Sequence, residues 1–392
     1  MKNIAVIFGG RSVEHEVSII TGMQIIENMD KTKYNPIPVY ITKDGRFLSG
    51  ESIKTIVAFK NSDFSQAEEV FFKPYAGDHN LYTIRSKKAS ILSKESDQVE
   101  IFAKIDAVFP AVHGTNGEDG TLQGLLEMVG IPYVGCGVMS AAVGMDKVTM
   151  KDVYKSHGIP MTQYTYFYRS DWQNNREEIL KEAEKIGYNL FVKPANLGSS
   201  IGISKACNRE ELISAIDIAV SYDSKVVIEK AVENPREINI SVLGYEDNLS
   251  VSACEEPVSI EKLLTYDEKY ISGSKGGSKG MKGQKRKLPA DLKEEVEEEI
   301  ERLAKEGFKS IGASGVARID FLLDKDKVYL NEINTLPGSI SFYLWEPTGL
   351  KFSDLITRLI EIAEKKYEAR KKNITSYDSQ LLNKTSYGAK LQ

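Results

Sequence analysis

The stretch Gly315-Val-Ala-Arg-Ile-Asp-Phe-Leu-Leu-Asp-Lys-Asp-Lys-Val-Tyr-Leu-Asn-Glu-Ile-Asn334 decides the fold of the second half of this chain. Two runs rich in apolar residues flank the polar tetrapeptide from Asp324 to Lys327. Apolar runs of this length around a short polar segment predict a β-hairpin. Thr-Leu-Pro-Gly338 follows directly, so the second strand ends in a turn.

Charged and amide side chains fall at alternating positions of this hairpin. Because successive side chains of a strand point to opposite faces, Arg318 shares a face with Asp320, and Glu332 shares a face with Asn334. If the connecting loop has an odd number of residues, Asp320 lies opposite Glu332, and Arg318 opposite Asn334. A two-residue turn would place Glu332 on the wrong face.

The converging groups would suit a magnesium ion. Mg²⁺ prefers oxygen ligands and shares them with phosphate groups. The hairpin therefore predicts a Mg²⁺ site at Asp320, Glu332 and Asn334, beside a place that holds phosphoryl charge. For most hairpins a solvated, charged face is the better interpretation. Here three further segments fit the same chemistry.

Composition restricts the class of protein. The chain has 392 residues, 41% of them hydrophobic and 27% charged, which is ordinary for a globular protein of two or three domains. A net charge of -5 and a pI near 5.7 argue against a general nucleic-acid binder. Three cysteines form neither a disulfide framework nor a zinc spacing. With no signal-like start or membrane-length apolar run, we expect a cytoplasmic protein with no membrane partner.

The N-terminal segment has the pattern of an α/β domain. Ile4 to Phe8 is a buried-strand pattern, a Gly-Gly loop follows, and Val17 to Asn28 predicts a helix, so we expect a mostly parallel sheet. The segment from Ser52 to Glu100 has weak periodicity and cannot be ordered. Further strands are expected at 36–41, 107–112, 190–193, 226–229 and 238–243, and helices at 122–129, 147–156, 289–309 and 354–372.

A lysine followed by a Gly/Ser loop offers a second anion site. Lys193 ends a strand, and the loop to Gly202 contains Ser199 and Ser200. Glycine lets backbone N–H groups close on phosphate oxygens, and serine hydroxyls add donors. The Walker A pattern is absent, so a P-loop NTPase is excluded. Lys147, which opens a helix, would be a surface lysine if considered alone.

Three further features gain meaning only together. Val227-Ile-Glu-Lys230 precedes Pro235-Arg-Glu237, where backbone groups could contact an adenine and Glu237 a ribose, although a solvated edge strand fits equally well. The basic Gly/Ser run from Lys269-Tyr270 to Pro289 has three interpretations: a nucleic-acid contact, a linker, or a lid, which we favour. Glu14 and His113 each follow a strand of the α/β domain, at the edge where open sheets place ligands.

In this order, the motifs resemble those of the D-alanine–D-alanine ligase family within the ATP-grasp superfamily. The resemblance covers residue 1 to about 370. The matching segments are Gly9 to Ser18, His113 to Gln123, Met145 to Lys147, Lys193 to Gly202, Lys269-Tyr270, Arg318 to Asp320 and Asn331 to Gly338.

The resemblance implies an α/β and α+β fold, in which an N-terminal parallel-sheet (pre-ATP-grasp) domain precedes a two-lobed ATP-grasp fold. The expected divisions are residues 1–140 for the N-terminal substrate-binding domain, 141–225 for the central lobe, 226–372 for the C-terminal lobe with a lid at 269–288, and 373–392 for a flexible tail.

The resemblance also implies residue roles for the ligation of two D-alanine molecules through an acylphosphate, with ATP and two Mg²⁺ ions that Mn²⁺ can replace. ATP would contact Lys147, Lys193, Ser199, Ser200, Glu229, Val232, Glu237 and Lys269. Asp320, Glu332 and Asn334 would ligate Mg²⁺. The first D-alanine would lie near Glu14 and His113, and the trio of Glu14, Ser199 and Tyr270 would order the lid. Arg318 and the N–H of Gly338 would stabilise the tetrahedral oxyanion.

One departure from the family pattern concerns the second substrate. The family usually binds its carboxylate with a Ser-Leu pair, and a gap-free alignment puts Tyr343-Leu344 there, beside the bulky Trp345. The second amino acid could therefore differ from D-alanine, for example D-serine. Lys269-Tyr270 fits an amine nucleophile, so a D-lactate product is disfavoured.

Two other classes remain as alternatives. The opening strand–loop–helix suggests a nicotinamide-dependent oxidoreductase, but Gly-x-Gly-x-x-Gly is absent. A non-enzymatic nucleotide-binding or RNA-binding protein rests on the basic run alone. The resemblance further implies a homodimer formed by N-terminal domains.

Overall fold

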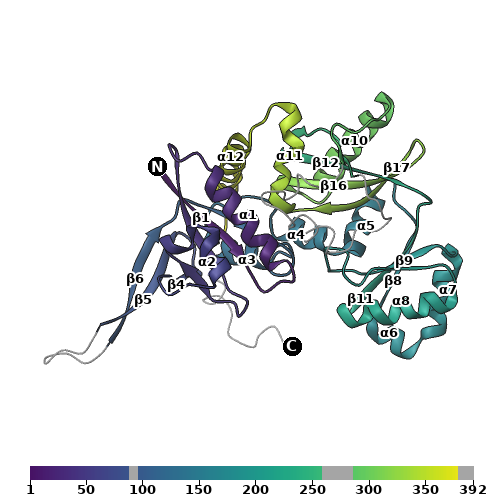
Figure 1. Cartoon of the computed structure of the whole chain (residues 1–392), viewed down its shortest axis with the longest axis horizontal. Coiled ribbons are helices and arrows are strands. Elements are labelled where there is room, and N and C mark those ends of the chain that lie inside the picture. Colours follow the sequence, from purple (N-terminus) through teal and green to yellow (C-terminus); the bar gives the residue numbers. More distant parts are fainter. Residues whose placement is uncertain (88–95, 258–285, 378–392) are drawn as a thin grey trace.

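The computed structural model describes residues 1–87, 96–257 and 286–377, and three sheets organise these residues (Figure 1). The largest has the strand order β6-β5-β4-β3-β2-β1-β7. Its strands are β1 (Lys2–Gly9), β2 (Tyr34–Ile41), β3 (Phe47–Ser49), β4 (Glu68–Phe72), β5 (Asn80–Lys87), β6 (Ser96–Lys104) and β7 (Ala107–Ala111).

Only the part of this sheet around β1 is parallel. Strands β2 and β7 run parallel to β1, whereas β3, β4, β5 and β6 add on as an antiparallel series. This series comes from the segment that sequence periodicity could not order, and its outer strands extend away from the body of the molecule (Figure 1). The α/β class expected for the domain is confirmed, but the expectation of a mostly parallel sheet is wrong, because the strands beyond β2 pair antiparallel.

Both faces of β1 are buried, as its continuous apolar run requires. Ile4, Val6 and Phe8 pack in one core with residues of α1 (His15–Asn28) and α12 (Phe352–Arg370). The alternate side chains pack in a second core with α3 (Thr121–Val129). The last helix of the fold therefore shares a core with the first strand, an arrangement that local sequence patterns do not reveal.

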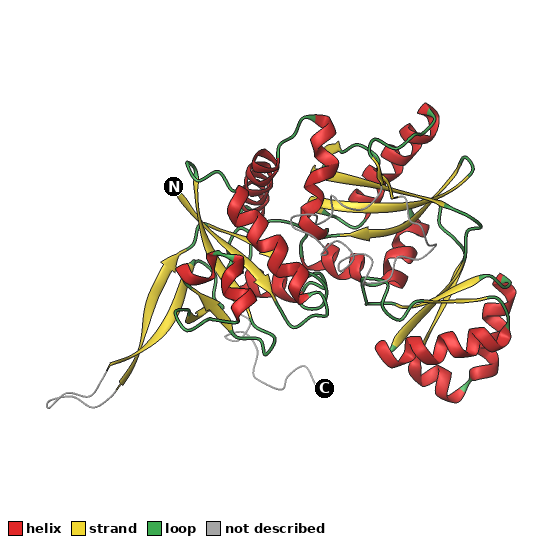
Figure 2. Ribbon diagram, in the orientation of Figure 1, coloured by secondary structure: helices red, strands yellow, loops and turns green. Residues whose placement is uncertain are grey.

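The second sheet has the order β10-β9-β11-β8 and is antiparallel. Its strands are β8 (Tyr164–Tyr168), β9 (Leu190–Pro194), β10 (Ser204–Ala206) and β11 (Lys225–Lys230), and its helices are α6 (Arg169–Asn174), α7 (Arg176–Ile186) and α8 (Arg209–Tyr222). Figure 2 shows the helices on one face of this sheet. Asn208 caps α8, because its side chain accepts from the N–H of Glu211.

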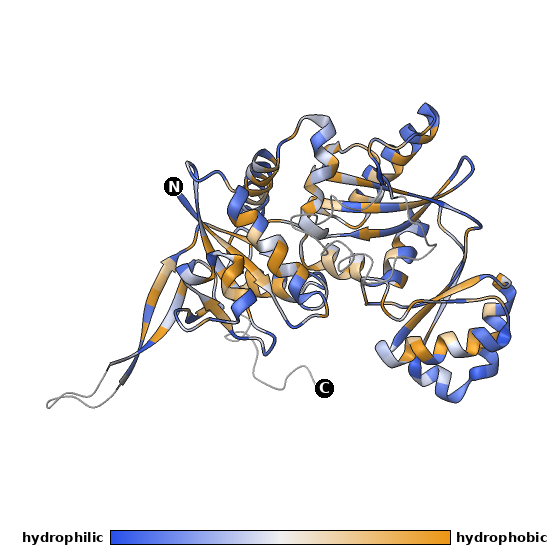
Figure 3. Ribbon diagram, in the orientation of Figure 1, coloured by the Kyte–Doolittle hydropathy of each residue, from blue (hydrophilic) through white to orange (hydrophobic). Residues whose placement is uncertain are grey.

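The third sheet has the order β13-β12-β16-β17. Its strands are β12 (Arg236–Tyr245), β13 (Asn248–Val251), β16 (Ser314–Asp324) and β17 (Lys327–Asn334), and a short pair, β14 (Glu256–Pro257) and β15 (Arg286–Lys287), lies beside it. Helix α10 (Glu294–Ser310) packs against the sheet. It begins five residues later than the expected 289, since residues 289–293 form no helix. Apolar residues gather along the strands, whereas α10 carries many hydrophilic side chains (Figure 3).

Two expected domain divisions need correction. A boundary at 225 would cut into β11, which pairs with β8 and β9 of the central sheet. The expected boundary after residue 140 falls inside α4 (Val138–Met145), and α5 (Lys147–Ser156) was assigned to the central lobe. Met150 and Tyr154 of α5 nevertheless pack in the core of the third sheet. Most of the expected lid and most of the expected tail lie outside the described residues.

The decisive hairpin pairs as expected but for a different reason. Asp324 pairs with Lys327, so the connecting turn has two residues, the length that was expected to misplace Glu332. A register shift next to Asp320 leaves Asn331 as an extra residue on β17, and beyond this β-bulge Asp320 pairs with Glu332. A bulge inserts one extra residue into a strand, so every side chain beyond the bulge points to the opposite face of the sheet from the one expected without it. The bulge therefore restores the face that the short turn would have lost.

The remaining short elements are α2 (Ile56–Asn61), α11 (Phe342–Trp345) and the 3₁₀ turns η1 (Glu51–Lys54), η3 (Gly338–Ser341) and η4 (Glu346–Thr348). Within the described ranges, no helix has the length and apolarity needed to cross a membrane.

Candidate functional site

A cavity of about 190 Å³ lies where the three sheets meet, and most of the predicted site residues line it. The N-terminal domain contributes Glu14 and His113, and the central segment contributes Lys147, Ser199 and Ser200. The third sheet contributes Glu237 from β12, and its hairpin and the following turn contribute Arg318, Asp320, Glu332, Asn334, Gly338 and Tyr343. This volume is below the range of about 300–1,000 Å³ typical of small-ligand pockets.

Four predicted residues do not line this cavity. Lys193, Glu229, Val232 and Leu344 are absent from its wall. Leu344 is fully buried, and its carbonyl accepts from the N–H of Ala253. Lys269 and Tyr270 lie outside the described residues.

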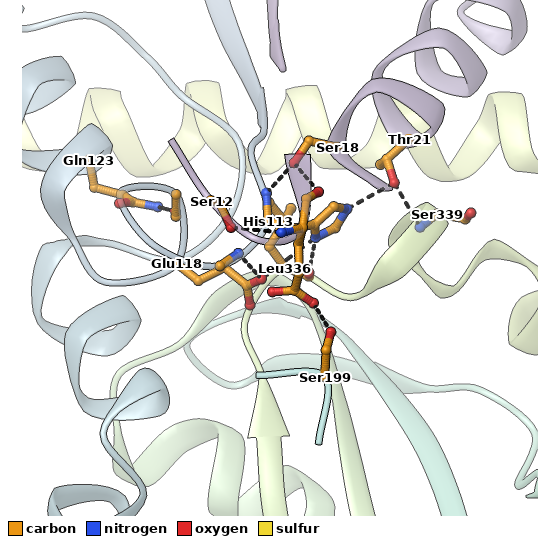
Figure 4. A network of polar contacts seen from close by, with 12 residues as sticks. Ser12, Ser18, Thr21, His113, Glu118, Gln123, Ser199, Leu336 and Ser339 are labelled. Carbon is orange, nitrogen blue, oxygen red and sulfur yellow. Dashed lines mark hydrogen bonds and ion pairs between the residues drawn. The ribbon is translucent and has the colours of Figure 1, made fainter. Parts of the chain in front are cut away.

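Glu14 joins the N-terminal domain to the Gly/Ser loop. The Ser199 hydroxyl donates to the Glu14 carboxylate, one of the three contacts expected of the trio (Figure 4). A side chain at Gly114 would approach Glu14 Oε2 to 2.7 Å, so glycine lets the loop close around the carboxylate. Burial, followed by the nearby Glu118 carboxylate, raises the pKa of Glu14. An incoming ammonium group would favour the ionised form.

His113 connects two parts of the site through buried hydrogen bonds (Figure 4). Its Nδ1 lies 3.0 Å from the Leu336 carbonyl, and its Nε2 lies 2.8 Å from the Thr21 hydroxyl. Thr21 also accepts from the N–H of Ser339, at 3.2 Å. Burial opposes a charge on His113, but the Glu118 carboxylate, 3.6 Å from Nδ1, raises the pKa of the imidazole. The network fixes the turn after β17 against helix α1.

The hairpin face presents the predicted metal ligands to the cavity. Arg318 donates to both oxygens of Asp320, at 2.7 and 2.8 Å, and the Asn334 amide donates to Asp320 Oδ2 at 3.1 Å. Asp320 is buried, and Glu332 pairs opposite it. Among the described residues, no group of three His, Cys, Asp or Glu side chains is placed to hold a metal ion. Two carboxylates and one amide fit Mg²⁺, whose other ligands are commonly water and phosphate.

Lys147 is positioned by the start of its helix. Asp146 caps α5 by accepting from the N–H groups of Val148 and Thr149, and it also pairs with Lys225 at 2.9 Å. Lys147 Nζ donates to the Leu197 carbonyl at 2.8 Å, within the Gly/Ser loop. A cation therefore stands at the cavity wall on a capped helix, where phosphate charge can reach it.

A buried charge cluster lies outside the cavity wall. Glu229 contacts Lys193 through one oxygen and Lys151 through the other, the latter at 2.9 Å. Burial lowers the pKa of Lys151 to about 8. Burial, together with the charge of Lys151, lowers the pKa of Lys193 to about 7. Lys193 and Glu229 are thus adjacent, as expected of residues that bind one ATP molecule, but in this structure they form an ion pair with each other.

The turn after Gly338 has an unusual backbone. Ser339, Ile340 and Ser341 have φ values of 52°, 47° and 51°, so three consecutive residues with side chains adopt the left-handed conformation. All three are buried. Such conformations cost free energy and collect at functional sites. The turn directs the chain from the hairpin to Tyr343.

Sequence reasoning missed several polar residues of the site. Glu118, Asn239, Glu255 and Arg286 line the cavity, and Lys151 lies in the buried charge cluster. One signal was available for Lys151, because it shares the buried face of α5 with apolar residues three positions away on each side. Glu118 lay within the quoted Gly-rich turn. Arg286 lay at the end of the basic run interpreted as a lid, whereas Asn239 and Glu255 had no local signal.

The comparisons with known proteins agree with this geometry. A family model described as the D-ala D-ala ligase N-terminus matches residues 3–136, and one described as the D-ala D-ala ligase C-terminus matches residues 153–361. The D-alanine–D-alanine ligase of Caldicellulosiruptor bescii is 44% identical over 375 residues, covering 94% of this chain and 96% of its own. That of Chloroherpeton thalassium is 41% identical, covering 94% and 98%.

Two solved structures are also similar. The D-alanine–D-alanine ligase from Coxiella burnetii has a TM-score of 0.77 and 29% identity, covering 95% of this chain and 96% of its own. The VanG D-Ala:D-Ser ligase from Enterococcus faecalis has a TM-score of 0.76 and 33% identity, covering 92% and 99%. With both family models matched and near-complete coverage of these relatives, this chain belongs to the D-alanine–D-alanine ligase family and has its ATP-grasp fold.

Proposed function

We propose that this protein is an ATP-dependent, ADP-forming D-alanine–D-alanine ligase that supplies D-alanyl-D-alanine for peptidoglycan synthesis. The observation that carries the proposal is the shared cavity. It combines the Glu14–Ser199 contact, suited to an amino acid, with Lys147 and the hairpin carboxylates, suited to a nucleotide phosphate. Membership in the family replaces the oxidoreductase and nucleic-acid-binding alternatives.

The first step joins the carboxylate of one D-alanine to the γ-phosphoryl group of ATP, and ADP leaves. Glu14, in its ionised form, would bind the ammonium group of this amino acid, and His113 would hold the neighbouring turn in place. Lys147 would contact the phosphates. Mg²⁺ held by Asp320, Glu332 and Asn334 would neutralise phosphate charge.

The second step joins the amine of another D-alanine to the acyl carbon, and inorganic phosphate leaves with the loss of one amine proton. A tetrahedral oxyanion forms during this step, and Arg318 and the N–H of Gly338 are the donors that would stabilise it. Both line the cavity. Arg318 is held by Asp320, so the oxyanion donor and the expected metal ligand are oriented by the same pair of hydrogen bonds.

The adenosine part of ATP is expected beside β11 and the linker to β12. Glu229 and Lys193 lie there in contact, Val232 lies on the linker, and Glu237 lines the cavity. We propose that Lys193 exchanges Glu229 for phosphate oxygens when the nucleotide enters. Ser199 and Ser200 would add hydroxyl donors from the Gly/Ser loop.

The metal assignment is tested with variants of one hairpin. Asp320→Ala and Glu332→Ala should each lower the rate of ADP release with D-alanine at least about 100-fold, because several kcal/mol of charge stabilisation is lost. Asp326→Ala is the matched control, since this exposed carboxylate lies in the turn of the same hairpin and pairs only with Lys293 among the described residues. Near-normal rates in either of the first two variants would refute the assignment.

A second candidate function keeps the first D-alanine but joins D-serine to it. The similarity to the VanG D-Ala:D-Ser ligase favours this candidate, as does tyrosine at position 343. Equal concentrations of D-alanine and D-serine should decide between the two, with the dipeptides separated by mass. We expect D-alanyl-D-alanine to predominate. A predominance of D-alanyl-D-serine would reverse our choice.

We further propose that the enzyme is a cytoplasmic homodimer formed by N-terminal domains, as the family resemblance implies. Light scattering on the purified protein tests the assembly. A mass near the 43.7 kDa of one chain would refute the dimer.

A further inference from the structure

One wall of the cavity has no role in the reaction as described so far. Glu255 and Arg286 line it together with Tyr343 and Asn239. Glu255 and Arg286 lie just before and within the small β14–β15 ribbon, and Tyr343 follows the left-handed turn. This wall is distinct from the residues proposed for ATP and for the first amino acid. A ligand of its own is therefore expected.

Tyr343 does not act as the substrate donor that its sequence position suggested. Its hydroxyl lies 3.1 Å from Glu255 Oε2 and donates to that carboxylate. Burial, with the Glu255 carboxylate, raises the pKa of Tyr343 beyond its ordinary range, so the phenol keeps its proton. The only proton of the phenol is thus already used. A substrate carboxylate here needs another donor.

Arg286 has such a donor. Its Nη1 pairs with Glu255 Oε1 at 3.1 Å, and its guanidinium lies 4.5 Å from the centre of the Tyr343 ring. The side chain is 15% exposed, and its buried Nη2 has no hydrogen-bond partner among the described residues. A buried cationic donor without an acceptor is costly. A guanidinium anchored in this way has one edge left for a carboxylate.

Asn239 adds the complementary group. It is buried in the same wall, its amide nitrogen lies 3.5 Å from Glu255, and its Oδ1 has no partner among the described residues. The wall thus presents one unmatched donor and one unmatched acceptor. An α-amino acid carries a carboxylate and an amine that would match both.

We propose that Arg286 binds the carboxylate of the second amino acid and that Asn239 Oδ1 accepts a hydrogen bond from its amine. Glu255 and Tyr343 are positioning residues that hold the guanidinium. This assignment rests on the proposed ligase function and extends it to the choice of nucleophile. The Glu255–Arg286 pair is neutral, so an amino acid with no net charge enters without leaving an unpaired charge in the wall.

The variant Arg286→Gln tests the proposal, with Lys287→Gln as the matched control. Lys287 is the next residue, but it is exposed and pairs with Glu256. For Arg286→Gln we expect the KM of the second D-alanine to rise roughly 100-fold, because a charge-assisted contact to a buried carboxylate is lost. We expect kcat to change much less, as for an interaction made equally in ground and transition states. Arg286→Lys should fall between, and Lys287→Gln should match the wild type.

Two readouts separate this role from a structural one. The first readout is isotope exchange in ATP, in which a labelled oxygen moves between the β,γ-bridge and the non-bridge positions. With the first D-alanine bound, this exchange reports acylphosphate formation alone. It should persist in Arg286→Gln. D-alaninamide, which lacks a carboxylate, can serve only as the nucleophile. The wild type should prefer D-alanine to D-alaninamide by roughly the same 100-fold, and this preference should disappear in Arg286→Gln.

The outcomes distinguish the two levels of the proposal. A folded Arg286→Gln enzyme with an unchanged KM for the second D-alanine, or an unchanged preference over the amide, overturns the assignment and leaves the ligase function standing. Equal loss of isotope exchange and ligation overturns it as well, because Arg286 would then support the whole site. A wild-type protein that releases no ADP with any amino acid overturns the proposed function and this assignment together.

Discussion

Replacing Ser341 with glycine should stabilise the protein. Ser341 is fully buried, has φ of 51°, and its hydroxyl has no hydrogen-bond partner among the described residues. The left-handed backbone costs about 1–2 kcal/mol for a residue with a side chain. The unpaired hydroxyl costs about 1–3 kcal/mol. Glycine removes both penalties but adds about 0.5–1 kcal/mol of unfolded-state entropy. The net expectation is a gain of about 2 kcal/mol in the free energy of unfolding.

Urea denaturation of the purified variants measures this gain, because a shift of the midpoint at constant slope reports stability. Ser341→Ala is the matched control, since it removes the hydroxyl but keeps the side chain in the left-handed backbone. It should gain about 1 kcal/mol less than Ser341→Gly. If the alanine variant proves as stable as the glycine variant, or more so, the backbone of this turn is not strained and the reasoning is wrong.

Three further predictions concern buried charges. Burial lowers the pKa of Lys193 to about 7, so the protonated form that would bind phosphate declines above that pH. The kcat/KM for ATP should therefore fall as pH rises. Lys193→Arg should remove this fall from the pH–rate profile, because arginine stays protonated. Asp146→Ala should destabilise the protein by about 2 kcal/mol at neutral pH, by loss of the α5 cap and the pair with Lys225. Because the folded-state pKa of Asp146 is lowered from 3.8, this difference should be present above that pH and should vanish in more acidic urea titrations. Lys366→Met should cost about 1 kcal/mol in the same assay, because the hydrogen bonds from Lys366 Nζ to the Gly135 carbonyl and the Ser314 hydroxyl are lost, while Ser314 still donates to Gly135.

The hairpin shows how far the sequence alone could lead. Alternation of side chains correctly predicted that Asp320 opposes Glu332, and that Arg318 opposes Asn334. The expected cause, an odd-numbered loop, was wrong, because the turn has two residues and Asn331 forms a bulge. A bulge depends on how one strand meets its partner in three dimensions, so the residue pattern of either strand does not specify it.

Other parts of the site depend on contacts between distant segments. The strand–loop and loop–helix patterns located Glu14 and Lys147, because local periodicity marks where a strand or helix ends. The wall formed by Asn239, Glu255 and Arg286 had no such mark, since each lies in a different segment and acquires its burial from the others. Charged residues gain chemical meaning from burial, which a single segment does not encode.

The core that β1 shares with α12 has a consequence for synthesis on the ribosome. The core that contains Ile4 and Phe8 is completed by Leu355 and Leu359, which emerge roughly 350 residues later. At about 5–20 residues per second, that face waits roughly 20–70 s for its cover. A nascent chain halted before Phe352 would leave part of this apolar core exposed to water and prone to aggregation. The yield of folded enzyme should therefore depend on ribosome-associated chaperones and on the rate of translation, and not on final stability alone.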